Sequence, residues 1–192
     1  MKNILVTGGA GYIGSHIIEI LVKKKFNIFI IDNLSTGYKK LINQKAKFYN
    51  CDIKNTKKLK KIIIKNNIES VIHLAGSLII GEGEKFPRKY YLNNVIGTKK
   101  LIEACVNSRI KNFIFSSTAA VYFEKLKRVN ENSKIKPKSV YGKTKLKAEK
   151  IIKNQFKKSS INYAILRYFN VAGASQSGKI GEIEKSHGHL IK

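Results

Sequence analysis

Two side chains four residues apart, Tyr141 and Lys145, are of types that together can move a proton. Residues at this spacing share one face of a helix, so the phenol and the ammonium would be neighbours. A free tyrosine has a pKa of about 10 and is a poor base at neutral pH, but a nearby positive charge favours its phenolate. Thr118, which ends the run Ser116-Ser117-Thr118, adds a hydroxyl that could relay a proton or hold a substrate hydroxyl. The three residues predict acid–base catalysis on an alcohol.

A glycine-rich turn near the N-terminus gives this pair its context, since a Tyr-x-x-x-Lys pattern alone is weak in a chain with 34 lysines. Residues 7–14 read TGGAGYIG, between an apolar segment and an amphipathic one. Gly8, Gly11 and Gly14 let the backbone turn tightly and approach a pyrophosphate, and the helix that follows would direct its free N–H groups and positive end toward that anion. This strand–turn–helix context predicts a dinucleotide-binding site.

An acidic residue stands where such a site needs one. Asp32 ends the second apolar segment, 18 residues after Gly14. In this position a carboxylate binds the adenosine ribose hydroxyls and repels a 2′-phosphate, so NAD is favoured over NADP. The other interpretation of a strand-end Asp is a simple turn former. For Asp52, which precedes Ile53, a role near the adenine and a role as a loop cap are equally supported.

The segments that must position these residues alternate between strands and helices. The fourth strand ends in His73-Leu74-Ala75-Gly76, whose small residues allow close cofactor approach, and we expect His73 to be structural. We expect the first helix to bury Ile13, Ile17, Ile20 and Leu21. The alternation predicts an α/β fold, a Rossmann-type doubly wound parallel sheet with helices on both faces. The expected strands are 4–6, 27–31, 47–50, 70–74, 112–115 and 163–166, and the expected helices are 12–24, 56–66, 90–107 and 143–157.

The overall composition excludes several classes of protein. The net charge of +26 raises the question of nucleic-acid binding, but the 38 basic residues include only four arginines and are scattered along the chain, which argues against a selected interface. Two distant cysteines, Cys51 and Cys105, suggest neither a disulfide framework nor a metal site and fit a cytoplasmic protein. The apolar run at the N-terminus is too short for a signal peptide, and no stretch approaches the about 20 apolar residues of a membrane span.

Seven stretches together resemble the extended short-chain dehydrogenase/reductase family and, within it, the UDP-glucose 4-epimerases. The resemblance runs along the whole chain but covers only the N-terminal part of the family fold. It predicts a division into an NAD-binding Rossmann domain at 1–172 and the start of a truncated substrate-binding region at 173–192. The stretches are VTGGAGYIGSH (6–16), DNLSTG (32–37), VIHLAG (71–76), YYLNNVIGT (90–98), NFIFSSTAAVY (112–122), YGKTKL (141–146) and LRYFNVAGA (166–174).

The resemblance implies a set of site residues. Tyr141 and Thr118 would be catalytic and also contact the substrate, Lys145 would serve both catalysis and NAD binding, and Asn170 would reach the nucleotide end of a UDP-sugar. No metal is implied. The remaining NAD contacts would be Gly8, Gly11, Tyr12, Ile13, Gly14, Asp32, Asn33, Asp52, Ile53, Leu74, Ala75, Gly76, Asn93 and Tyr168.

The reaction implied is inversion of C4 of a UDP-hexose, with UDP-glucose and UDP-galactose as the default pair, through a 4-keto intermediate. Related nucleotide-sugar 4,6-dehydratases need an Asp-Glu pair after the threonine to eliminate water, whereas here Ala119-Ala120 follows Thr118. The resemblance also implies a homodimer formed through helices 90–107 and 143–157. The alternative function is a non-catalytic NAD-binding remnant of a truncated or split epimerase gene, because the substrate domain is largely absent.

Overall fold

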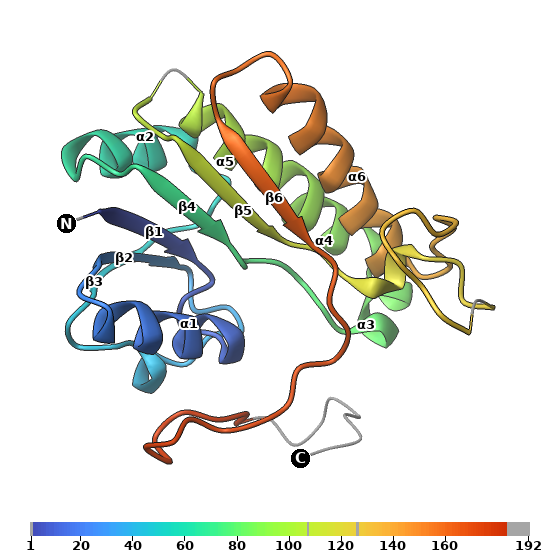
Figure 1. Ribbon diagram of the computed structural model, residues 1–192, viewed down its shortest axis with the longest axis horizontal. Coiled ribbons are helices and arrows are strands. Elements are labelled where there is room, and N and C mark those ends of the chain that lie inside the picture. Colours follow the sequence, from blue (N-terminus) through green and yellow to red (C-terminus); the bar gives the residue numbers. More distant parts are fainter. Residues whose placement is uncertain (1, 107, 126, 184–192) are drawn as a thin grey trace.

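A six-stranded, fully parallel sheet organises the chain in the computed structural model, which describes residues 2–106, 108–125 and 127–183 (Figure 1). The strand order is β3-β2-β1-β4-β5-β6, the order of the dinucleotide-binding Rossmann fold. The expected fold class is therefore confirmed, and each strand lies within one or two residues of its predicted position. The strands are β1 (Asn3–Thr7), β2 (Asn27–Asp32), β3 (Lys47–Asn50), β4 (Ser70–His73), β5 (Asn112–Ser116) and β6 (Asn162–Leu166).

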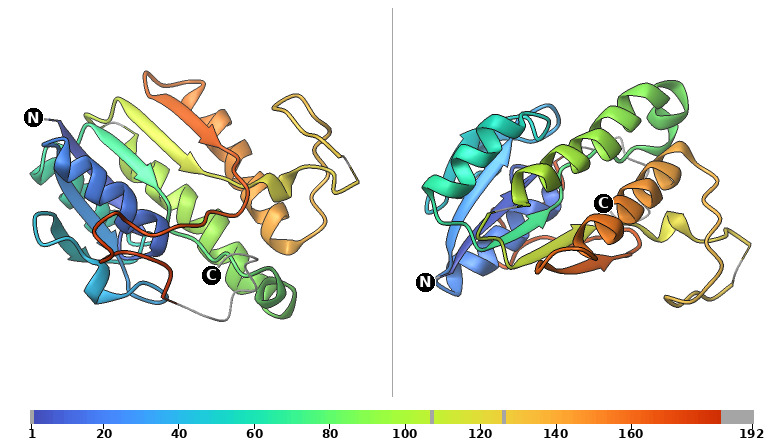
Figure 2. Two further views of the ribbon diagram at one scale, coloured as in Figure 1. Left: turned by 60° about the horizontal axis from the view of Figure 1, so that its bottom comes forward. Right: turned by 90° about the horizontal axis from the view of Figure 1, so that it is seen from above.

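Helices cover both faces of this sheet (Figure 1, Figure 2). Helix α1 lies on one face, and α2, α5 and α6 pack side by side on the other. The longer helices are α1 (Tyr12–Lys23), α2 (Thr56–Lys65), α5 (Thr98–Cys105) and α6 (Val140–Phe156). Shorter ones are η1 (Lys39–Leu41), α3 (Ile80–Lys85), α4 (Pro87–Tyr90), η2 (Tyr91–Gly97) and η3 (Ala119–Val121). Among the described residues, no helix is long and apolar enough to cross a membrane.

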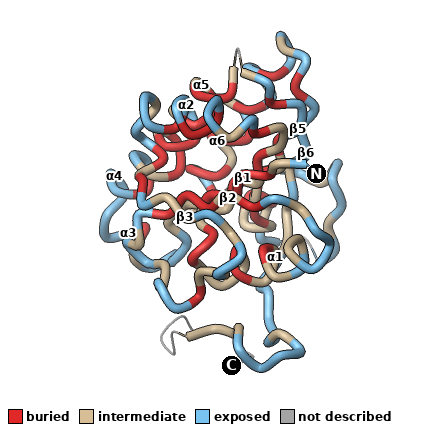
Figure 3. Tube along the Cα trace, turned by 90° about the vertical axis from the view of Figure 1, so that its left-hand side faces the viewer, coloured by how far each residue is buried: buried red, intermediate tan, exposed pale blue. Residues whose placement is uncertain are grey.

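Strand alternation divides the core into two clusters. Leu5, Val71 and Phe113 belong to the larger cluster, beneath α2, α5 and α6. Val6 and Ile30 belong to the smaller cluster, which packs against α1. Buried residues run through the middle of the molecule, whereas the loops and the last described segment are largely exposed (Figure 3). Burial on both faces explains why the strands read as continuous apolar runs.

The buried side of α1 differs from our expectation. Ile18 is fully buried, whereas Ile20 is 54% exposed, and the buried stripe runs through Gly14, Ile18 and the neighbouring Leu21. The reason is contact between backbones: a Cβ on Gly14 would lie 2.3 Å from the carbonyl oxygen of Gly8. This close approach turns the Gly14 side of the helix toward the sheet.

The expected helix at 90–107 is in fact three consecutive helical segments that begin earlier, at Pro87. Proline is favoured in the first turn of a helix because that turn needs no N–H donor. The middle segment, η2, is a π-helix, a wider turn that often occurs at functional sites. The expected end at Asn107 lies outside the described residues. The shift matters because η2 carries Asn93, a residue of the expected site.

The edge of the sheet beside β6 is open. Tyr163, Leu166 and Phe169 are 40%, 48% and 71% exposed. Beyond β6 the chain crosses to α1, where the carbonyl oxygen of Gly173 accepts a hydrogen bond of 2.6 Å from the hydroxyl of Tyr12 (Figure 1). The described part of the expected substrate-binding region, 173–183, has no helix or strand.

Candidate active site

The start of α6 brings the Tyr-x-x-x-Lys pair to the carboxyl ends of the strands. The Ser139 hydroxyl caps the helix by accepting from the N–H of Gly142 at 3.1 Å, and the Glu84 carboxylate accepts from the N–H of Val140 at 2.8 Å. A Cβ on Gly142 would lie 2.5 Å from the carbonyl oxygen of Ala120. This glycine therefore lets α6 approach the loop after β5, which contains Thr118.

The side chain of Tyr141 lies close enough to that of Thr118 for the two to interact. Burial raises the pKa of Tyr141, the interaction with Thr118 lowers it, and nearby Tyr168 raises it. The expected lowering of this pKa by the charge on Lys145 is not seen in the chain by itself. The Tyr168 phenol is hydrogen-bonded to Ser116, so Tyr141 lies among side chains from the ends of β5 and β6.

Lys145 is a buried cation to which the described residues offer no hydrogen-bond acceptor. It is 5% exposed, and its Nζ lies 4.5 Å from the centre of the Phe115 ring. Burial lowers its pKa to about 8, and Glu149 acts in the opposite direction. Among the hydrogen bonds of residues 2–106, 108–125 and 127–183, none involves its ammonium. Ribose hydroxyls of a bound dinucleotide would supply the missing acceptors.

The three motif glycines have different steric environments. Gly8 has a φ of +73°, and a Cβ there would lie 2.7 Å from the N atom of Ala75. Gly14 is required by the contact with Gly8 described above. Gly11 has an ordinary φ of −87°, and its only close contact would be the Gly8 oxygen at 3.3 Å. The fold itself therefore requires glycine at 8 and 14, whereas at 11 glycine keeps space open in front of α1.

The N-terminus of α1 is open to an anion. No side chain caps it, and its first turn has no acidic residue. Its first N–H groups and the positive end of its dipole face this opening, where Tyr12 and Ile13 are half-buried. The residues present thus fit a pyrophosphate group.

Asp32 already holds the glycine turn in place. Its Oδ2 accepts from the N–H of Ala10 at 3.0 Å, and its Oδ1 accepts from the N–H of Leu34 at 2.9 Å. Asn33 donates to Oδ2 of Asp52 at 3.2 Å, and Oδ1 of Asp52 accepts from the N–H of Lys54. The loop-cap role of Asp52 is therefore present. The ribose and adenine roles of these carboxylates stay predictions.

The end of β4 connects the glycine turn to Lys145. Leu74, Ala75 and Gly76 are half-buried. Ala75 lies against Gly8, and a Cβ on Gly76 would lie 3.8 Å from Nζ of Lys145. The expected small residues thus lie between the uncapped helix and the buried ammonium.

Asn94, which our sequence analysis did not select, lies between the Gly76 turn and α6. Asn94 is 2% exposed, accepts from the N–H of Ser77 at 2.8 Å and donates to Thr144 Oγ1 at 3.1 Å. Asn93 instead donates to Ser77 Oγ and accepts from Lys54. The two are adjacent in the sequence and therefore face different sides of η2, and only the tertiary structure shows which one is buried.

His73 and Asn170 complete the set of expected residues. His73 is fully buried between the hydroxyls of Thr7 and Thr98, at 2.7 and 2.9 Å, and burial lowers its pKa to about 3. The expectation that it is structural agrees with this. Asn170 is exposed on the segment after β6, and its expected role stays a prediction.

A family model described as the NAD dependent epimerase/dehydratase family matches residues 4–189. The chain belongs to this family. A UDP-glucose 4-epimerase of Lactobacillus helveticus is 43% identical over 189 residues, covering 98% of this chain and 57% of that protein.

Two solved structures from the epimerase/dehydratase family extend the comparison. UDP-glucose 4-epimerase from Brucella ovis in complex with NAD has a TM-score of 0.94 and 38% identity, covering 99% of this chain and 58% of that one. The Bifidobacterium longum enzyme in complex with NAD+ and UDP has a TM-score of 0.90 and 32% identity, covering 96% and 58%. This chain thus spans just over half the length of the family members it matches.

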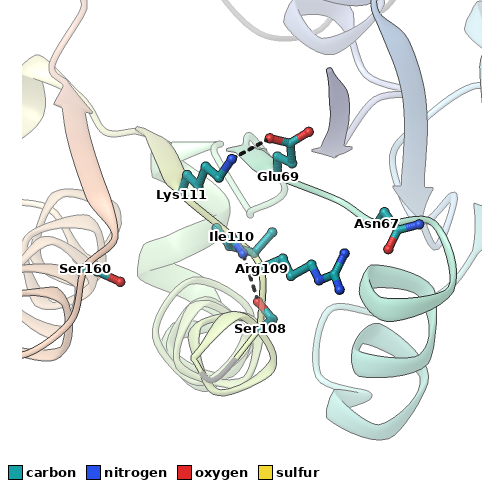
Figure 4. Close-up of a pocket in the computed structure, with 7 residues that line it drawn as sticks. All are labelled: Asn67, Glu69, Ser108, Arg109, Ile110, Lys111 and Ser160. Carbon is teal, nitrogen blue, oxygen red and sulfur yellow. Dashed lines mark hydrogen bonds and ion pairs between the residues drawn. The ribbon is translucent and has the colours of Figure 1, made fainter. Parts of the chain in front are cut away.

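Two hollows lie at opposite ends of the strands. One, of about 480 Å³, lies at the amino ends of β4, β5 and β6 and contains the Lys111–Glu69 ion pair of 3.0 Å (Figure 4). The other, of about 870 Å³, is lined by Ala119 and Ser139, beside Thr118 and near Tyr141 in the sequence, and by Phe169. Ligands of open parallel sheets bind at the carboxyl edge, so for a member of this family the second hollow adjoins the candidate site.

Proposed function

We propose that this chain is the NAD-binding part of a UDP-hexose 4-epimerase. The observation that carries the proposal is that four features gather at the carboxyl ends of the strands: the uncapped N-terminus of α1, the Ala75-Gly76 turn, the buried ammonium of Lys145, and the neighbouring Tyr141 and Thr118. In this proposal the pyrophosphate binds at the N-terminus of α1, the ribose of the nicotinamide half binds at Lys145, and the acid–base pair acts beside it. Family membership supports the same assignment.

Each residue has a defined task in this proposal. The N–H groups of α1 bind the pyrophosphate, and Asp32 binds the adenosine ribose, which favours NAD over NADP. Asn33, Asp52 and Ile53 border the adenine. Lys145 binds the ribose of the nicotinamide half through its ammonium. Tyr168 and the asparagines of η2 border the nicotinamide half.

Proton transfer is assigned to Tyr141. NAD, when bound, supplies the hydride acceptor, and its positive nicotinamide adds the charge that the buried phenol needs in order to ionise. Tyr141 takes the proton of the sugar 4-hydroxyl, with Thr118 holding that hydroxyl in line, and later returns a proton to the 4-keto sugar. Transfer of the hydride from C4 to bound NAD and its return to the opposite face of the 4-keto sugar would invert C4. Ala119 and Ala120 offer no acid or base for elimination, so the reaction stops at inversion.

We infer that turnover needs more protein than the 192 residues of this chain. The family members matched here are longer by about two-fifths of their length, at 57–58% coverage. We infer that the additional part closes the exposed edge at β6 and, with Asn170, binds UDP. UDP-glucose and UDP-galactose are the proposed pair.

The experiment has two parts. Calorimetric titration of this chain should give tighter binding of NAD than of NADP. Asp32→Ala should reduce the difference between the two affinities. The chain completed with the C-terminal part of a full-length family member should interconvert UDP-glucose and UDP-galactose in a coupled assay. NAD binding without turnover in a well-folded completed chain would favour the non-catalytic remnant. Equal or tighter NADP binding would remove Asp32 from its role.

A further inference from the structure

A buried ion pair lies behind the Tyr141 site, on residues that the proposed reaction does not use. Glu149, on α6, has a side chain that is 1% exposed. Its Oε1 accepts from Nε of Arg167 at 2.9 Å, and its Oε2 accepts from Nη2 at 2.6 Å. The Ser117 hydroxyl also donates to Oε1. One carboxylate thus binds three donors from the ends of two strands.

Each partner of Glu149 directly precedes a residue of the site. Ser117 precedes Thr118, and Arg167 precedes Tyr168. The backbones of the two segments are also paired, through the N–H of Ser117 to the oxygen of Leu166 at 2.8 Å and the N–H of Ala119 to the oxygen of Tyr168 at 3.0 Å. Movement of either partner would therefore move a side chain that acts on Tyr141.

We propose that Glu149 is a positioning residue that joins α6 to the ends of β5 and β6 and thereby sets Thr118 and Tyr168 around Tyr141. The proposal deepens the function proposed above, since it takes the Tyr141 site to be the active site. Glu149 touches no expected ligand. It acts through Ser117 and Arg167, while Tyr141 and Glu149 stand on the same helix, eight residues apart.

The carboxylate is chemically suited to this task. It has two oxygens that accept only, so it can satisfy a hydroxyl and both arms of a guanidinium at once. An amide in its place would direct N–H groups at the donors of Arg167. The guanidinium is held from a second side as well, because it lies 5.1 Å over the ring of Tyr122.

Glu149 also places a negative charge one helical turn beyond Lys145. It raises the pKa of Lys145 against the larger effect of burial. The other titratable side chain that faces this ammonium is His73 of β4, which is neutral above its pKa of about 3. The pKa of Lys145 therefore reports the charge of Glu149, separately from its contacts with Ser117 and Arg167.

The test uses the whole chain without ligand, so it is independent of NAD binding. Glu149→Gln and Ser117→Ala are compared with Glu103→Gln, a control that removes an exposed carboxylate from its 2.8 Å pair with Lys100. NMR of labelled tyrosine follows the rings of Tyr141 and Tyr168, with Tyr49 of β3 as an internal reference. NMR of labelled lysine gives the pKa of Lys145.

We expect Glu149→Gln to shift or broaden the signals of Tyr141 and Tyr168, leave Tyr49 in place and lower the pKa of Lys145. Ser117→Ala should shift Tyr141 and leave the pKa of Lys145 unchanged, since the charge remains. The control should change neither. Wild-type tyrosine signals in a folded Glu149→Gln chain would overturn the proposal. If that variant does not fold, an unshifted Tyr141 in Ser117→Ala would do the same.

Discussion

Burial acts in opposite directions on the pKa values of Tyr141 and Lys145. It raises that of Tyr141 and lowers that of Lys145 to about 8. Both shifts favour the neutral side chain, which is the reverse of the phenolate and ammonium that the proposed reaction needs. A ligand with a positive ring and ribose hydroxyls would reverse both preferences, so we infer that the pair becomes active only when the cofactor is bound.

Tyr141→Phe separates proton transfer from cofactor binding. In the completed enzyme we expect turnover to fall by about 10²–10⁴-fold, the usual contribution of a general acid–base group. NAD affinity should change by less than about twofold, because the phenol contributes little to binding. Near-full turnover in the variant would show that another group moves the proton.

Lys145 predicts a dependence of stability on pH. Its folded pKa of about 8 lies below the ordinary 10.5, so between these values the unfolded chain binds more protons. The free energy of unfolding should therefore rise with pH across this window, at up to about 1.4 kcal/mol per pH unit from this group, while its destabilising effect is fully present below pH 8.

Lys145→Met tests this by urea unfolding at several pH values between 7 and 10. The variant should be more stable than the wild type near neutral pH and should lose this part of the slope. NAD affinity should fall by about 10–100-fold, the value of a hydrogen bond to a charged group. Lys143→Met, an exposed neighbour on α6, is the matched control and should alter neither quantity. An unchanged slope in Lys145→Met would contradict the assignment.

At the scale of elements, the turn between β1 and α1 contains two kinds of glycine. The backbone requires glycine at 8 and 14, whereas a methyl group fits at 11. Gly8→Ala would force a side chain into a φ of +73° and against Ala75, so we expect a loss of at least about 1–2 kcal/mol. Gly11→Ala meets only a slightly close Gly8 oxygen. We expect its stability to stay within about 1 kcal/mol of the wild type.

The informative result is NAD affinity in the folded Gly11→Ala chain. A methyl group in front of α1 should weaken NAD binding by roughly tenfold or more, or about 1.4 kcal/mol. Urea unfolding and calorimetry on the same samples separate the two effects. Wild-type affinity in this variant would mean that the pyrophosphate does not lie over the start of α1.

At the scale of the whole molecule, two of the exposed apolar areas on the described surface bear on assembly. One is at β6, with Leu166 48% exposed, and the other is on η2, with Tyr91 and Leu92 41% and 39% exposed. Large exposed apolar patches usually mark interaction sites. We assign the area at β6 to the additional part of the longer family members and the area on η2 to a second copy of this chain.

We therefore expect a dimer formed through η2, α5 and α6 of each copy. Light scattering over a range of concentrations should give twice the mass of one chain, with a saturating transition. Leu92→Lys should produce monomers, because a charge would be buried without a partner. Leu166→Lys, a similarly exposed leucine at β6, should leave the dimer intact. A monomer at all concentrations, or dissociation by Leu166→Lys alone, would contradict the assignment.

The sequence by itself determined the features that depend on neighbours along the chain. Apolar runs gave the strands to within one or two residues. The strand–glycine–helix pattern located the turn that precedes α1, and the spacing of Tyr141 and Lys145 placed them on one face of α6. Each of these follows from backbone geometry and local periodicity.

Only the tertiary structure decided which side of an element faces inward and what burial does to a charge. It buried Ile18 rather than Ile20 because Gly14 rests on Gly8, and it buried Asn94 between Ser77 and Thr144. It also brought Glu149 to Arg167, 18 residues away in the sequence. Contacts and desolvation depend on groups that fold in from distant segments, so no local pattern contains them.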